Sequence, residues 1–156
     1  MSKALTVVDH KRLAAITTVA DAKKVRDEIA ALQHYAKVSR QSLKDQNAVA
    51  CAKFRVERRA GELLLQVPKV QGNRHGETGL VSTIERSGLS PETAYRWMAL
   101  ARIPEAELLA WAALCDADAE ELTGRLVYEV LVRQWAARHG APTRSRRACA
   151  RSSPAT

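Results

Sequence analysis

Apolar positions recur at helical intervals over the first half of the chain and predict two long helices. From about residue 18 or 21 to 38, alternating steps of three and four residues place apolar side chains at Ala22, Val25, Ile29, Leu32 and Ala36. From about 43 to 67, the same steps recur at Val49, Ala52, Val56, Ala60, Leu63 and Val67. A turn of a few residues separates the two patterns, so we expect a long antiparallel helical hairpin within residues 1–67. The segment before it is expected to be loosely held, with Leu13 and Ile16 packing on the hairpin.

Two shorter helical patterns, joined by a glycine, follow the hairpin. Ser82 and Glu85 have the spacing of a capping box, which predicts the start of the first of these helices. Gly88 is suited to the left-handed conformation that ends a helix. Ser90 as N-cap and Pro91 at the first helical position predict that a second helix begins directly after it. The helical period then places a set of apolar residues on one face, expected to pack on Ile84 and Leu89: Ala94, Trp97, Met98 and Ala101.

The rest of the chain is also predicted to be helical or irregular, which makes the fold all-α. A third short helix is expected from Pro104 to about Cys115, and a fourth from Asp118, as N-cap, to His139. We therefore expect a bundle of about four helices over residues 80–140, with residues 68–79 as a linker or loop. Residues 141–156 lack periodicity and carry four arginines, so this basic tail is predicted to be disordered.

The glycine-centred pair of helices resembles the helix-turn-helix DNA-binding superfamily over about residues 80–102. The residues that carry the resemblance are the turn Gly88-Leu89-Ser90 and the segment Thr93-Ala94-Tyr95-Arg96-Trp97. Ile84 stands where the family usually has a small residue, which predicts a changed crossing of the two helices. The resemblance is to small regulators of the phage, prophage and plasmid type, and it implies that the second helix enters the major groove of double-stranded DNA.

Candidate DNA contacts follow from this resemblance and from side-chain chemistry. Arg96 is suited to a bidentate contact with guanine, and Ser90 lies where a phosphate would meet a helix N-terminus. The full set of candidates is Ser90, Thr93, Tyr95, Arg96 and Arg102 in the second helix and its caps, with Lys69, Arg74 and His75 in the linker.

Charge agrees with a nucleic-acid partner. The formal net charge is +8, with an excess of Lys and Arg in residues 1–67 and 141–156 and an excess of Asp and Glu in residues 104–140. A basic surface attracts phosphate without regard to sequence, although a solvated basic face that keeps the protein soluble explains the hairpin's charge equally well.

Other functional classes find little support in the residues. Cys51, Cys115 and Cys149 lack metal-binding spacing, and Cys51 and Cys115 are expected to be small core residues. No nucleophile with an acid/base partner, phosphate loop or metal set is recognisable, so we expect neither an enzyme nor a cofactor. No apolar run approaches the about 20 residues that span a bilayer, and no signal peptide is seen, so a cytoplasmic protein without membrane contact is expected.

Two hypotheses of function result. The first is a sequence-specific DNA-binding protein, a transcriptional or replication/partition regulator of a mobile element. The alternative is a helical protein–protein interaction adaptor, including a DNA-packaging adaptor similar to a small terminase subunit. The hairpin would either form a homodimer or higher oligomer, which suits paired DNA half-sites, or pack against the C-terminal helices of its own chain.

Overall fold

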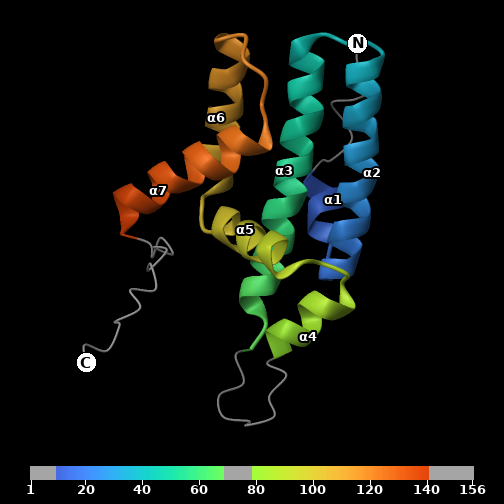
Figure 1. Cartoon of the computed structure of the whole chain (residues 1–156), viewed down its shortest axis with the longest axis vertical. Coiled ribbons are helices and arrows are strands. Elements are labelled where there is room, and N and C mark those ends of the chain that lie inside the picture. The colour runs from blue at the N-terminus through green and yellow to red at the C-terminus, as the bar shows by residue number, and fades with distance from the viewer. Residues whose placement is uncertain (1–9, 69–78, 141–156) are drawn as a thin grey trace, which may run out of the picture.

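Every regular element that the structure describes is helical, as predicted. The computed structural model describes residues 10–68 and 79–140 (Figure 1). The predicted tail, and the linker candidates Lys69, Arg74 and His75, lie outside the described residues. None of the described helices is both long enough and apolar enough to cross a bilayer. The elements are α1 (His10–Ala15), α2 (Val19–Val38), α3 (Leu43–Gln66), α4 (Gly79–Arg86), α5 (Pro91–Ala101), α6 (Glu105–Ala117), η2 (Leu126–Leu131) and α7 (Val132–His139).

The hairpin is formed by α2 and α3, which run antiparallel side by side (Figure 1). The Thr18 hydroxyl accepts the backbone N–H of Asp21 at 3.1 Å, which fixes the start of α2. Ser42 caps α3 in the same way, because its hydroxyl accepts the backbone N–H of Asp45 at 3.2 Å. Both long helices therefore begin and end within a few residues of the predicted bounds.

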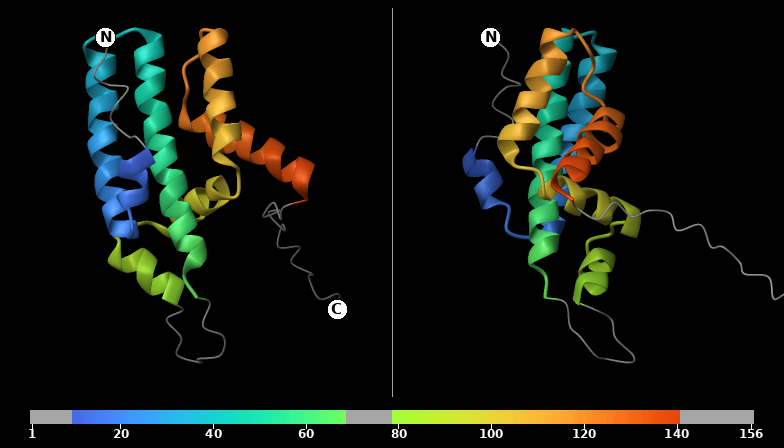
Figure 2. Two further views of the ribbon diagram at one scale, coloured as in Figure 1. Left: turned by 180° about the vertical axis from the view of Figure 1, so that it is seen from behind. Right: turned by 90° about the vertical axis from the view of Figure 1, so that its left-hand side faces the viewer.

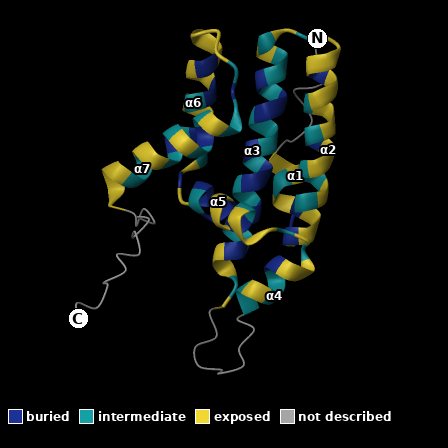
Figure 3. Cartoon of the chain, viewed as in Figure 1, coloured by how far each residue is buried: buried dark blue, intermediate teal, exposed yellow. Residues whose placement is uncertain are grey.

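The predicted seam between α2 and α3 is confirmed at its buried members but fails at Leu32. Its buried members are Ala22, Ile29 and Ala36 on α2 and Val49, Val56 and Ala60 on α3. Leu32 was predicted to belong to this seam but is 44% exposed, so that part of the prediction is wrong. Leu32, Tyr35 and Val38 are all exposed near the C-terminus of α2. Figure 3 shows exposed positions along this helix.

Helix α3 is the central element of the fold because it is buried on two sides. Phe54 and Ala50 point away from the seam and join a core made with α6 and the C-terminal helix. Leu64 joins a smaller core with Ile84 and Met98. The hairpin thus packs on the C-terminal helices of its own chain, one of the two arrangements expected, while oligomerisation stays a prediction. In the right-hand view of Figure 2, α1 lies on one side of α3, and α4, α5 and α7 lie on the other.

Two predicted helix starts are wrong. Helix α4 begins at Gly79, so Ser82 lies inside the helix, and its hydroxyl accepts a hydrogen bond from Nη2 of Arg86 at 2.9 Å instead of capping. Helix α6 continues to Ala117, and Asp118 follows its end rather than starting the next helix. The last helix starts after Thr123, whose hydroxyl accepts the N–H of Leu126 at 3.3 Å. The predicted helix is therefore several residues too long at its N-terminus.

Buried Asn47 explains why the chain is not helical between α6 and the last helix. Its amide Nδ2 donates to Oδ1 of Asp116 and to the carbonyl of Glu120, both at 2.9 Å. Its Oδ1 accepts the N–H of Leu122 at 2.8 Å. The Asn47 side chain thus supplies hydrogen-bond partners to backbone groups of an irregular connection about seventy residues later in the chain. No local sequence pattern reveals such a long-range contact.

The last helix is irregular in its first half. Leu126–Leu131 (η2) is wound as a π-helix, and the chain then continues as α7. Val127 and Leu131 are fully or almost fully buried in the core around Phe54. Tyr128 packs edge to face on the Phe54 ring, with ring centroids 6.0 Å apart. This packing brings the C-terminal helix across α3 and towards α5.

Candidate functional site

The connection between α4 and α5 has the geometry that the sequence predicts. Gly88 is in the left-handed region, with φ of 69°. The Ser90 hydroxyl accepts the backbone N–H of Thr93 at 3.2 Å, and Pro91 is the first residue of α5. Since the cap and the proline both specify the start of α5, the helix begins at the predicted residue.

The buried face of α5 is also the predicted one, but its main contact is different. Ala94, Trp97, Met98 and Ala101 are all buried, and Ile84 and Leu89 pack nearby as expected. However, α5 packs more extensively on α3 than on α4. The two helices are closest at Gly61, where an added Cβ would lie only 1.9 Å from the carbonyl oxygen of Trp97. The orientation of α5 is therefore set chiefly by the hairpin.

The opposite face of α5 is exposed and carries the predicted DNA-contacting residues that have long side chains. Tyr95 is 46% exposed, and Arg102 is exposed just after the helix ends. The Arg96 guanidinium forms an ion pair with Glu92 at 3.1 Å, and both side chains are more than half exposed. An exposed pair of this kind is weak, so Arg96 is able to exchange Glu92 for another partner at little cost.

Ser90 and Thr93, the two predicted DNA-contacting residues with short side chains, bind each other at the N-terminal cap of α5. The Ser90 hydroxyl donates to Oγ1 of Thr93 at 2.8 Å while it also accepts the Thr93 N–H. Ser90 is exposed, whereas Thr93 is half-buried. The structure thus brings Ser90, Thr93, Tyr95 and Arg96 together at the N-terminal half of α5, with Arg102 at its other end.

A groove with a volume of about 770 Å³ runs beside the exposed face of α5. One wall is the α5 segment from Pro91 to Ala99, and the other is the C-terminal helix from Gly124 to Arg133. Its floor comes from α2 and α3. The cations that line it are Arg26, Lys53, Arg96, Arg125 and Arg133, and the carboxylates are Glu57, Glu92 and Glu129.

A buried carboxylate joins three elements at the floor of the groove. Glu57 is 2% exposed, accepts Nε of Arg26 at 3.0 Å and accepts the hydroxyl of Tyr128 at 2.5 Å. Burial and the adjacent Glu57 carboxylate raise the pKa of Tyr128 well above its ordinary value. Burial alone would lower the pKa of Arg26, but its hydrogen bond to Glu57 and the charge of Glu57 raise it. Arg26 therefore stays charged and Tyr128 neutral, and together they hold α2, α3 and η2 in place.

Lys53 is the cation of the floor that lacks a carboxylate partner. No ion pair joins it to any residue in the described ranges, and its Nζ lies 4.8 Å from the centre of the Phe54 ring. Burial lowers the pKa of the Lys53 ammonium, and the charge of Glu57 only partly opposes this. The ammonium group is thus partly removed from water without a neutralising neighbour.

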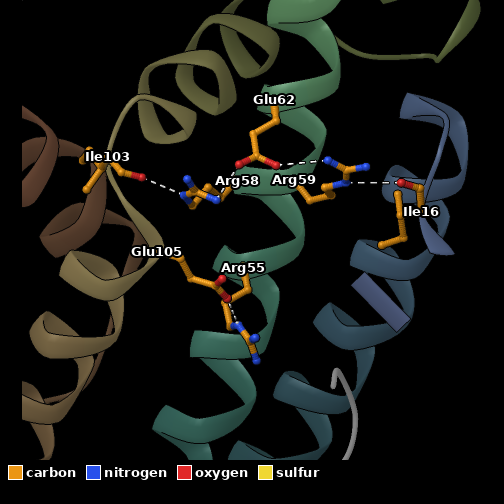
Figure 4. A network of polar contacts seen from close by, with 7 residues as sticks. All are labelled: Ile16, Arg55, Arg58, Arg59, Glu62, Ile103 and Glu105. Carbon is orange, nitrogen blue, oxygen red and sulfur yellow. Dashed lines mark hydrogen bonds and ion pairs between the residues drawn. The ribbon is translucent and has the colours of Figure 1, made fainter. Parts of the chain in front are cut away.

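Other arginines of α3 bind their own chain instead of facing a ligand (Figure 4). Arg55 pairs with Glu105 at 2.6 Å. Arg58 donates to the carbonyl of Ile103 at 2.7 Å, and Arg59 donates to the carbonyl of Ile16 at 3.3 Å. Both also bind Glu62, as the figure shows. Much of the hairpin's basic charge therefore fastens α1 and the α5–α6 connection to α3.

Sequence reasoning missed Lys53, Arg125 and Arg133 as members of one surface. They come from two distant parts of the chain, and neither helix carries a motif that marks them. Only the tertiary structure brings these three residues together, because the packing of η2 on Phe54 places the last helix beside the groove.

The described residues were also compared with the ligand sets of metal sites and with the surroundings of reactive thiols. Within residues 10–68 and 79–140, no three His, Cys, Asp or Glu side chains are grouped to hold a metal ion. Cys115 lies in the core, and Cys51 packs against it, as expected of small apolar residues. Burial raises the pKa of Cys51 to about 11, so its thiol is protonated at neutral pH.

No family model, curated protein or solved structure matches this chain. The structure by itself defines an all-α protein in which α5 is packed firmly on α3 and exposes its other face beside a basic groove.

Proposed function

We propose that this protein binds double-stranded DNA in a sequence-specific way, with α5 as the reading helix, as a transcriptional or replication/partition regulator of a mobile element. The observation that carries the proposal is the division of α5 into two faces. One face is fixed on α3 through Trp97 and Gly61, and the other displays Tyr95 and Arg96 to solvent. A rigidly held helix with exposed polar side chains at its N-terminal half suits major-groove readout.

Each side chain has a role that its position supports. Arg96 donates to O6 and N7 of a guanine after it leaves Glu92. Tyr95 contacts a base edge or phosphate, and Arg102 contacts a phosphate at the far end of α5. The hydroxyls of Ser90 and Thr93 bind each other, so these residues fix the start of α5. A phosphate of the DNA backbone is favoured at this helix N-terminus. Lys69, Arg74 and His75 are proposed as backbone contacts from the linker.

Arg96→Ala is expected to remove site preference while the fold is retained. A bidentate contact with guanine discriminates by about 1–3 kcal/mol, so the ratio of specific to random affinity should fall about 5- to 150-fold. The preferred site is first selected from a random duplex library, and the variant is then titrated against that site and against random duplex by fluorescence anisotropy.

Lys44→Ala is the matched control for Arg96→Ala. Lys44 is exposed in the first turn of α3, near the hairpin turn and far along α3 from Gly61, and its loss changes the net charge equally. It should leave the affinity ratio unchanged. An Arg96→Ala variant that keeps the wild-type ratio contradicts the role of Arg96 as the reading residue.

The proposal includes a homodimer formed through the hairpin, since a two-fold protein matches two half-sites of DNA. Its support is the exposed apolar face of α2 at Leu32, Tyr35 and Val38. The same face is also what favours the adaptor alternative, in which a different protein covers it.

Tyr35→Glu is expected to convert the dimer to a monomer in sedimentation equilibrium, because it places a charge in the centre of the apolar face. Leu114→Glu is the matched control, since Leu114 is a similarly exposed apolar residue on α6. A wild-type protein that stays monomeric at all concentrations would disprove the dimer and favour the adaptor alternative.

A further inference from the structure

The groove beside α5 carries more positive charge than its neighbours neutralise. Three of its cations have carboxylate partners: Arg26 binds Glu57, Arg96 binds Glu92 at 3.1 Å, and Arg125 lies 3.7 Å from Glu129. Within the described ranges, Lys53 and Arg133 have no such partner. They face the groove from its floor and from its far wall. The groove is therefore set up to receive an anion between two elements.

Lys53 is the stronger indication of an absent anion. It leaves α3 one turn from buried Glu57, and the side chain is half-buried, which lowers the pKa of its ammonium group. Glu57 does not neutralise it, because that carboxylate already binds Arg26 and Tyr128. A partly desolvated cation is stabilised when an anionic oxygen replaces its lost hydration.

We propose that this groove binds phosphates of the DNA backbone next to the base pairs that α5 reads, with Lys53 and Arg133 as the contacting residues. This rests on the proposed function and extends it to residues outside the helix-turn-helix. The groove is continuous with the reading face, because Tyr95 and Arg96 line its near wall. Helices α5 and α7 lie on the same side of α3 in both views of Figure 2. One duplex can therefore contact the exposed face of α5 and the groove together.

Duplex phosphate fits the groove better than an acidic peptide or a single strand. The anion-seeking groups lie beside an exposed recognition-type helix, and backbone contacts of this kind set the register of such a helix on a duplex. Single-strand sites use exposed aromatic platforms on which bases stack. Of the aromatic side chains that line the groove, Phe54 is buried and Tyr128 is half-buried, which leaves Tyr95 as a single exposed ring instead of a row of stacking platforms.

The test is a Lys53→Ala/Arg133→Ala double variant of the full chain, titrated with random-sequence duplex DNA at several salt concentrations. Two lost phosphate contacts should reduce the slope of log affinity against log salt by about 1.8. The affinity gap between wild type and variant should therefore narrow about tenfold from 50 to 200 mM salt. Selectivity for the preferred site should remain, because backbone contacts carry no base information.

Lys24→Ala/Lys44→Ala is the matched control, since it removes two exposed cations from other surfaces. Arg133→Glu is the second variant, because Arg133 is exposed and its reversal leaves the core intact. Equal slopes for the groove variant and the control would overturn the proposal. So would a variant that loses affinity for single-stranded DNA while it keeps wild-type affinity for duplex.

The outcomes separate this proposal from the one on which it rests. If Arg96→Ala removes selectivity and the groove variants behave like the control, the groove assignment alone fails. If the groove variants lower the salt slope and Arg96→Ala changes nothing, the reading role of Arg96 fails while the groove stands. Absence of duplex binding by the wild type at low salt overturns both.

Discussion

Replacing Gly61 with alanine is expected to lower the free energy of unfolding by about 3 kcal/mol, a large loss for a single methyl group. The new Cβ would lie 1.9 Å from the carbonyl oxygen of Trp97 and 2.9 Å from Cβ of Ala101. The obstacle is backbone rather than the end of a flexible side chain, so α3 and α5 must separate. Their separation opens the cores on either side of the crossing, where Leu64 and Leu100 are buried. Urea denaturation followed by circular dichroism measures the loss.

Gly124→Ala is the matched control for Gly61→Ala. Gly124 lies at the start of the last helix, and an added Cβ there meets nothing within 4 Å. Since alanine favours a helix over glycine, this variant should be unchanged or more stable by up to about 1 kcal/mol. A Gly61→Ala variant that is as stable as Gly124→Ala would show that the α3–α5 crossing tolerates a side chain and that the close approach is not limiting.

Asn47→Ala is the second substitution with a large expected effect, about 3 kcal/mol of lost stability. It leaves the buried N–H of Leu122 without an acceptor and the carbonyl of Glu120 without its donor. The unmet N–H of Leu122 is buried and costs about 1–3 kcal/mol, and the carbonyl of Glu120, which is only partly buried, adds a smaller loss. Thermal and urea denaturation report the change, and exchange of the Leu122 amide hydrogen should become faster.

Asn47→Asp tests the same bonds with nearly the same shape. Its Oδ1 still accepts from Leu122, but its second oxygen faces Oδ1 of Asp116 and the carbonyl of Glu120, which are both acceptors. The folded state should therefore raise the pKa of the new carboxyl above its ordinary value of about 4. The stability of Asn47→Asp relative to wild type should therefore be greatest below about pH 4. It should decrease as the pH rises through the raised pKa of the new carboxyl. A variant whose deficit against wild type does not change with pH contradicts this geometry.

Local signals were sufficient for the parts of the fold that depend on neighbouring residues. Thr18 and Ser90 each bind a backbone N–H three residues ahead, so their side chains specify a helix start by themselves. The buried face of α5 followed from the helical period alone. In contrast, Asp118 looks like an N-cap, but Asn47 holds the following backbone in an irregular path from another helix.

The second buried face of α3 and the groove depend on contacts that no spacing reveals. Phe54 shares its side of α3 only with small apolar residues such as Ala50 and Cys51, and its role is evident only once Leu131 and Leu108 join it in one core. Lys53 is adjacent in sequence and resembles any solvated lysine of the basic hairpin. The DNA-contact candidates on α5 were predictable because one helix carries them all. The groove was not predictable, because it forms only where α5 and the last helix lie side by side.

The π-helical winding of η2 determines where the positive charges of the last helix point. Arg125 and Arg133 lie on either side of η2, and on a regular α-helix their directions would differ by about 80°. A π-helical segment accommodates one extra residue, which takes up about 100° and leaves the two arginines within about 20° of a common line. Deletion of one residue from η2 would allow regular α-helical winding and would keep the two arginines within about 20° of that line, whereas insertion of one residue would rotate Arg133 by about 100°, out of the groove. One irregular turn thus aligns two guanidinium groups along the same side of a helix, and an insertion there would alter the surface without removing any of its charges.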